Sequence, residues 1–301
     1  MTAPEGAIAR IAAEVWSEFS RGHGALLVVG HGTRNQLGAA QFLNLVGQMK
    51  AKAREAVIDG CFLELAEPNI QQAIEAMRVR GIEKLLVVPV LLFSASHAQS
   101  DIPDAVIHAA TVHGMQVIGQ TDPLGTHPSL LSLSSTRYQE LVALGRSARC
   151  PTNACARVQC NDGNCEASGV SLGRIGLAMV GRGTSNELAL AHMRTLTELR
   201  VRNQPIEHFE TGFFAGGKPD VDTLFDLADR WPCDTVVVQP HLLFEGELID
   251  QLRNKVLERR LQQSDRNWLI ARTLGADPLL AELFLKLAHD ELVRLQPLFF
   301  G

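Results

Sequence analysis

The stretch Leu26-Leu-Val-Val-Gly-His31-Gly-Thr-Arg-Asn35 predicts a buried strand that delivers one histidine to the edge of a sheet. Its four consecutive aliphatic residues leave no polar alternation, which is typical of a parallel strand covered by helices on both faces. Open parallel sheets bind ligands at the carboxyl ends of their strands, where His31 stands. The flanking glycines keep the backbone around the imidazole free of side chains. His31 is therefore a candidate functional residue, although a lone histidine after a strand is often just a hydrogen-bonded loop residue.

Composition limits the class of protein. The 301 residues are 46% hydrophobic, enough for two domains or one large α/β unit. A formal charge of −5 shows no broad basic field, so we expect no nucleic-acid partner. The longest apolar run, 85–93, is far shorter than the roughly 20 residues of a membrane helix, so we expect no membrane partner. Without an apolar signal segment at the N-terminus, we expect a cytoplasmic protein without disulfides.

The first half of the chain alternates between strand and helix patterns. This alternation predicts an α/β fold with a parallel sheet of about four strands, covered by helices on both faces. Because proline is tolerated in the first turn of a helix, Pro103 places the start of one helix at about Asp101. The predicted strands are 26–29, 57–64, 85–93 and 115–119, and the predicted helices are 3–20, 39–52, 69–80, 101–113 and 128–144.

The second half repeats the first. Val180-Gly-Arg182-Gly-Thr-Ser-Asn186 matches Val29-Gly-His31-Gly-Thr-Arg-Asn35, with Arg182 lying 151 residues after His31. The same offset carries Pro68 onto Pro219 and Pro89 onto Pro240. Such a long register predicts a duplication, with two tandem copies of one small α/β domain. The duplication supplies a second domain within one chain, so we expect a monomer to suffice, although the sequence leaves the oligomeric state open.

The predicted domains are an N-terminal copy at 1–145 that carries the site, a cysteine-rich linker at 146–173, and a degenerate C-terminal copy at 174–301. Four thiols in the linker, with four residues between each and the next, differ from the paired spacing of structural zinc sites. Their number fits an iron–sulfur cluster better than their spacing does. A thiol-rich linker and a metal-delivery segment are the alternatives. These residues are Cys150, Cys155, Cys160 and Cys165.

Three potential metal ligands lie at or just beyond the ends of three predicted strands of the first copy: His31, Glu64 and His97. Two imidazoles and a carboxylate suit a first-row divalent metal, and open coordination positions would admit a substrate that is itself a ligand. The second copy replaces all three at the same offset, by Arg182, Ala215 and Leu248. Because all three are replaced together, they are expected to act together in one site that the second copy has lost. We therefore predict a metal site in the first copy.

Three segments resemble the sirohydrochlorin chelatases of the CbiX/SirB type, which are class II chelatases, in their long two-domain form. They are Val28-Val-Gly-His31-Gly-Thr-Arg, Phe62-Leu-Glu64-Leu-Ala-Glu-Pro68, and Val87-Val-Pro-Val-Leu-Leu-Phe-Ser-Ala-Ser-His97-Ala-Gln-Ser-Asp101-Ile-Pro103. The resemblance implies two chelatase-like domains that insert Co²⁺ or Fe²⁺ into sirohydrochlorin, toward cobalamin or sirohaem. We favour cobalt, because the long form with the segment from His97 to Pro103 looks most like the cobalt enzymes.

The resemblance also implies roles for individual residues. His31 and His97 would bind the metal and act in catalysis, and Glu64 would be a third ligand or the outgoing proton path. Since sirohydrochlorin carries many carboxylates, Arg34 and Arg182 are candidates for binding it, although each also reads as a solvated surface residue. A non-enzymatic carrier of Co²⁺ or Ni²⁺ is the alternative function. A nucleotide-binding module is disfavoured, because the glycine turn lacks a third glycine and no P-loop lysine follows.

Overall fold

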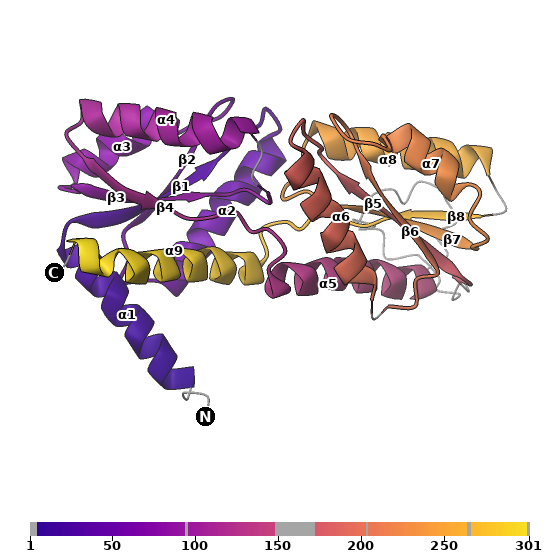
Figure 1. Cartoon of the computed structure of the whole chain (residues 1–301), viewed down its shortest axis with the longest axis horizontal. Coiled ribbons are helices and arrows are strands. Elements are labelled where there is room, and N and C mark those ends of the chain that lie inside the picture. The colour runs from indigo at the N-terminus through magenta and orange to yellow at the C-terminus, as the bar shows by residue number, and fades with distance from the viewer. Residues whose placement is uncertain (1–4, 94–95, 148–171, 203, 264–265, 300–301) are drawn as a thin grey trace. The chain divides into compact units, whose positions relative to one another are not determined.

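The computed structural model describes residues 5–93, 96–147, 172–202, 204–263 and 266–299 (Figure 1). The chain forms two compact units, one of Met1–Gly125 with Ala276–Gly301 and the other of Thr126–Gly275. Each unit contains a four-stranded parallel sheet. This confirms the predicted α/β class with one small parallel sheet per copy. Among the described residues, no helix is both long enough and apolar enough to span a membrane.

The sheet of the first unit has the strand order β2-β1-β3-β4, so β1 is a central strand. All seven residues of β1 are buried, as its unbroken apolar run predicts. The strands are β1 (Gly24–Gly30), β2 (Ile58–Phe62), β3 (Lys84–Pro89) and β4 (Gln116–Gln120). The helices that precede or follow them in the first half of the chain are α1 (Glu5–Arg21), α2 (Gln36–Lys52), α3 (Ile70–Val79) and α4 (Ser96–Val112).

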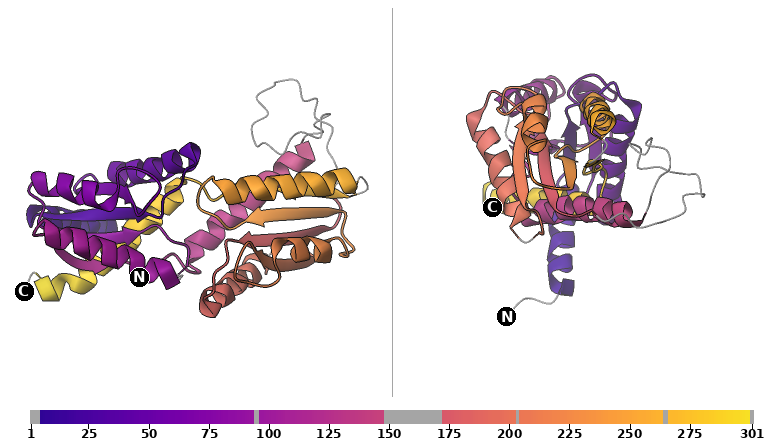
Figure 2. Two further views of the ribbon diagram at one scale, coloured as in Figure 1. Left: turned by 90° about the horizontal axis from the view of Figure 1, so that it is seen from above. Right: turned by 90° about the vertical axis from the view of Figure 1, so that its right-hand side faces the viewer.

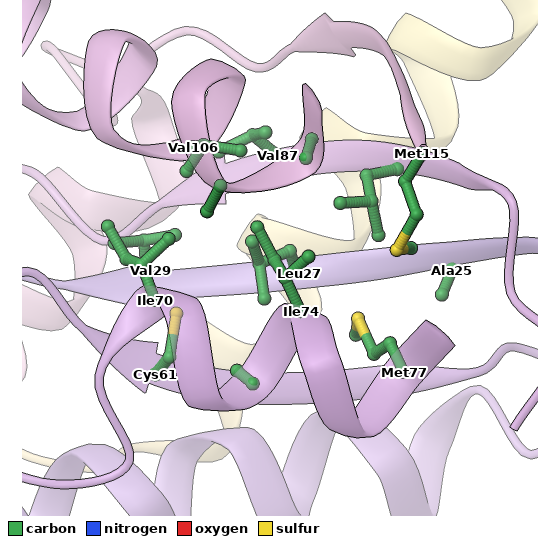
Figure 3. Close-up of a cluster of buried hydrophobic side chains, with 14 of the residues drawn as sticks. Ala25, Leu27, Val29, Cys61, Ile70, Ile74, Met77, Val87, Val106 and Met115 are labelled. Carbon is green, nitrogen blue, oxygen red and sulfur yellow. The ribbon is translucent and has the colours of Figure 1, made fainter. Parts of the chain in front are cut away.

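The core of the first unit lies on both faces of its sheet. Alternate residues of β1, namely Ala25, Leu27 and Val29, pack with residues of α3 and α4 in one buried cluster (Figure 3). The opposite face is covered by α2, which buries Leu45 and Met49. Burying each large aliphatic side chain contributes about 1.5–3 kcal/mol to folding. Because helices pack on both faces of β1, they fix the position of its last residue, Gly30, from which the loop with His31 begins.

The second unit repeats this architecture, with strand order β6-β5-β7-β8. In the first sheet Gly30 pairs with Phe62, and in the second Gly181 pairs with Phe213, 151 residues later in both strands. The strands are β5 (Ile175–Gly181), β6 (His208–Phe213), β7 (Thr235–Pro240) and β8 (Asn267–Ile270). Three of its helices are α6 (Glu187–Val201), α7 (Val221–Ala228) and α8 (Glu247–Gln262). The predicted duplication therefore extends to the register of strand pairing.

The closing helices of the two copies are exchanged. We expected the helix at 128–144 to close the first domain, but α5 (Pro128–Ser147) belongs to the second unit, where it packs on α6 and β8. In turn α9 (Pro278–Phe299), from the second copy, packs on α1, α2, β3 and β4 of the first unit (Figures 1 and 2). The predicted boundaries at 145 and 174 thus follow the repeat in the sequence but not the compact units.

The bounds of three predicted elements also need correction. The helix expected at 101–113 is α4, which begins at Ser96 and contains Pro103 in its interior. An internal proline forfeits one backbone hydrogen bond but does not have to begin a helix, so the proline signal placed the start too late. The strands predicted at 57–64 and 85–93 end earlier, at Phe62 and Pro89. The cysteines of the predicted linker, Cys150, Cys155, Cys160 and Cys165, lie outside the described residues.

Candidate functional site

The three predicted donors follow three adjacent strands of the first sheet. His31 comes directly after the central strand β1, and Glu64 lies two residues after β2. His97 is the second residue of α4, which follows β3, so it belongs to the first turn of a helix. Because parallel strands share one carboxyl edge, all three backbone positions belong to the same edge of the sheet.

Backbone contacts fix the loop of His31 against the loop of Glu64. The Leu63 N–H donates to the Gly30 carbonyl at 2.8 Å, and the Glu64 N–H donates to the His31 carbonyl at 3.0 Å. Gly32 has a φ of 102°, and a side chain there would overlap the carbonyl oxygen of Glu64. Only glycine allows this approach, so the turn after β1 requires it for a steric reason. These contacts join the two loops, 30–32 and 63–64, into one platform.

The platform brings two of the predicted donors together. His31 Nδ1 lies 3.5 Å from Glu64 Oε1, and their side chains are 36% and 54% exposed. An imidazole nitrogen and a carboxylate oxygen at this spacing can both reach one divalent ion, and their exposure leaves room for further ligands. Among the described side chains, no group of three histidine, cysteine, aspartate or glutamate residues forms a metal site. The side chain of His97 is not among those described.

The second copy keeps this platform but not its donors. The Phe214 N–H donates to the Gly181 carbonyl, and the Ala215 N–H donates to the Arg182 carbonyl at 3.1 Å. The exposed side chain of Arg182 takes the place of His31. Leu248 is the second residue of α8, as His97 is of α4. The pairing of the three replaced positions, which was predicted from the offset, is therefore confirmed by the fold.

The predicted substrate-binding arginines are both exposed. Arg34 lies three residues after His31, between the glycine turn and the start of α2. The Asn35 side chain caps α2 by accepting from the Gly38 N–H at 3.0 Å, which fixes the end of this loop. Arg34 is thus an exposed residue of an anchored segment, three positions from His31 in the sequence, and Arg182 directly follows β5 in the other copy.

Polar groups at the strand ends of the second copy were missed by the sequence reasoning. His241 directly follows β7 and is 2% exposed, and burial lowers its pKa to about 4. A buried neutral imidazole is not open to a substrate in solution, and its counterpart in the first copy is Val90. Arg253 pairs with the largely buried Glu245 in the loop after β7, with Nη1 2.7 Å from Oε2. His241 and Glu245 both follow β7, which ends at Pro240, and this position after a strand was the sequence signal that could have identified them.

Comparison with known proteins identifies the family of the chain. A family model described as CbiX matches residues 25–141 and again residues 176–291, which covers both copies. A sirohydrochlorin cobaltochelatase of Priestia megaterium is 25% identical over 89% of this chain and 80% of its own length. A sirohydrochlorin ferrochelatase of the same organism is also 25% identical, over 83% of this chain and 84% of its own length.

Solved structures show the same fold. SirB from Bacillus subtilis with Fe³⁺ has a TM-score of 0.69 at 21% identity, and the match covers 92% of this chain and 98% of SirB. The sirohydrochlorin chelatase SirB from Bacillus subtilis subspecies spizizenii, in complex with cobalt, has a TM-score of 0.67 at 20% identity, with 90% and 96% coverage. The resemblance predicted from the sequence is confirmed, and the chain belongs to the CbiX family.

Proposed function

We propose that this protein is a sirohydrochlorin chelatase, which inserts a divalent metal ion into sirohydrochlorin. The observation that carries the proposal is the pair of His31 and Glu64, 3.5 Å apart on a backbone-locked platform at the carboxyl edge of the sheet. Membership of the CbiX family and the names of the relatives support the choice of reaction. We favour Co²⁺ because of the resemblance of the segment from His97 to Pro103, and Fe²⁺ is the alternative, since the relatives include both cobalto- and ferrochelatases.

The chemistry needs a metal donor and a proton acceptor. During insertion two pyrrole N–H protons leave the macrocycle, while the ion exchanges protein and water ligands for the ring nitrogens. In the proposed mechanism the neutral imidazoles of His31 and His97 hold the incoming ion. Glu64 is a third ligand or receives a departing proton, because a carboxylate within reach of the ion serves either role. The ion is a substrate of the reaction, so the donors must also release it.

A turnover assay tests the proposal against the alternative of a metal carrier. The purified full-length chain is mixed without oxygen with sirohydrochlorin and Co²⁺ or Fe²⁺, and metal insertion is followed by absorbance. We expect product in excess of protein and a rate well above the uncatalysed rate, higher with Co²⁺ than with Fe²⁺. A carrier would bind Co²⁺ or Ni²⁺ but would not turn over. A rate equal to the uncatalysed rate with both metals would reject the proposed enzyme.

Glu64→Gln should lower kcat by about tenfold or more, because the amide keeps the shape and one oxygen donor but loses the negative charge and the basic oxygen. Glu67→Gln is the matched control, an exposed carboxylate of the same loop, and should leave kcat unchanged. Equal effects of the two variants would mean that only the charge of the loop matters.

Arg34→Gln and Arg182→Gln should each raise the KM for sirohydrochlorin about fivefold with little change in kcat, because each removes one exposed charge-assisted contact to a substrate carboxylate. Raising the ionic strength should weaken the contribution of both arginines. Arg54→Gln is the control, since Arg54 precedes β2 and so belongs to the amino edge of the same sheet. If Arg54→Gln raises KM equally, the effect comes from net charge and not from these two contacts.

A further inference from the structure

Leu65, directly after Glu64, has an unusual backbone conformation. Its φ is 64°, and among the described residues only His23 shares a positive φ without being glycine. For a leucine this left-handed conformation is strained, because its Cβ crowds the following carbonyl group. The side chain is also 48% exposed, so the core of the protein does not account for it. The loop thus holds an apolar side chain in a costly conformation and leaves it largely in water.

The second copy has a glycine, Gly216, at the position that corresponds to Leu65. Gly216, 151 residues later, also has a positive φ, of 65°, and glycine adopts such a value freely. A Cβ on Gly216 would overlap the Thr184 carbonyl, whereas the loop of the first copy accommodates the leucine. The strained leucine therefore occurs in the copy that carries His31 and Glu64, and glycine occurs in the copy that has neither of them.

Hydrogen bonds hold Leu65 close to the candidate donors. The Glu64 N–H donates to the His31 carbonyl, and the Ala66 N–H donates to the Glu64 carbonyl at 2.8 Å. The backbone on both sides of Leu65 is thereby fixed relative to His31. A single exposed leucine is ordinary on a protein surface, but strain that persists beside reactive groups is typical of functional sites.

We propose that Leu65 is a substrate-contacting residue that packs against the apolar face of the planar macrocycle while His31 and Glu64 handle the metal ion. This inference rests on the proposed chelatase function. A conjugated tetrapyrrole has polar groups at its rim but an apolar face, so a leucine held beside the metal donors is shielded from water when the substrate binds. Because hydrogen bonds already fix the backbone around Leu65, the entropic cost of ordering this loop against the substrate is lower.

The test is Leu65→Gly in the full-length chain. We expect the KM for sirohydrochlorin to rise about tenfold, because glycine has no side chain to pack on the macrocycle, while kcat and the affinity for Co²⁺ stay within about twofold. Binding of metal-free sirohydrochlorin, measured by absorbance titration, should weaken by the same factor. The thermal midpoint should be unchanged or higher, because glycine removes the strain. Leu43→Ala, at another exposed leucine in the first unit, is the control and should leave KM unchanged.

Two further variants separate the side chain from the backbone. Leu65→Asn tolerates the left-handed conformation but is polar, so it should raise KM as glycine does, whereas Leu65→Met should keep KM within about twofold of the wild type. If the wild type is active but the glycine and asparagine variants keep its KM, the inference about Leu65 is wrong and the chelatase proposal stands. If the wild type gives no turnover above the uncatalysed rate, the proposed function itself fails. A lower midpoint in both variants with unchanged KM would make Leu65 a structural residue.

Discussion

His31→Ala should lower kcat/KM for metal insertion by at least about 100-fold and leave the thermal midpoint nearly unchanged. The imidazole is one of the two described donors at the sheet edge, and loss of even an outer partner of a metal ligand costs about 10- to 100-fold. Its side chain is 36% exposed, so the alanine leaves little unfilled space in the core. The measurements are the insertion rate, the Co²⁺ affinity and a thermal melt of the same preparation.

His108→Ala provides the control, since His108 is an exposed histidine on α4. It should change neither the rate nor the Co²⁺ affinity. The corresponding variant at His97, on the first turn of that helix, tests the second proposed ligand and should cause a loss of similar size. If His31→Ala loses stability in proportion to activity, the residue supports the fold, and the metal role proposed for it must be abandoned.

The candidate site could be predicted from the sequence because it depends on strand order in the chain and on a shared sheet edge. The apolar run before His31 indicated a strand, and the joint replacement of His31, Glu64 and His97 in the second copy marked them as a set. The left-handed conformation of Leu65 could not be predicted, because a leucine gives no signal of positive φ. It follows from the backbone contacts between two loops that are distant in sequence.

The fold of each unit was predictable, but the exchange of closing helices was not. Both α5 and α9 follow the last strand of their own repeat, and both have an apolar face that needs a sheet. Periodicity identifies that face but does not say which of two similar sheets will cover it. Contacts that are specific to one partner decide the matter. Leu295 of α9 lies over Gly119 of β4, and Gln239 of β7 donates to the Ser134 carbonyl of α5 at 2.7 Å.

Arg137 on α5 offers a direct test of this exchange. It is 2% exposed, and its Nη2 donates to the Leu274 carbonyl at 2.6 Å while its Nε donates to the Thr273 carbonyl at 3.2 Å. Arg137→Ala leaves both carbonyls without these charged donors and opens a cavity, so we expect the free energy of unfolding of the second unit to fall by about 3 kcal/mol. Arg272→Ala is the control. Both Arg137 and Arg272 pair with Glu140, but Arg272 is 43% exposed, so its removal should cost no more than about 0.5 kcal/mol.

Hydrogen exchange shows which unit the Arg137 substitution affects. Because Thr273 and Leu274 belong to the second unit, Arg137→Ala should speed exchange of the amides in β5, β7 and β8, while those in β1 and β3 keep their protection. The opposite pattern would mean that α5 closes the first sheet, as the repeat in the sequence suggested. Metal insertion should persist at temperatures where the variant remains folded, since the proposed metal donors, His31, Glu64 and His97, belong to the first unit. A loss of activity without faster exchange would instead give α5 a role in the reaction.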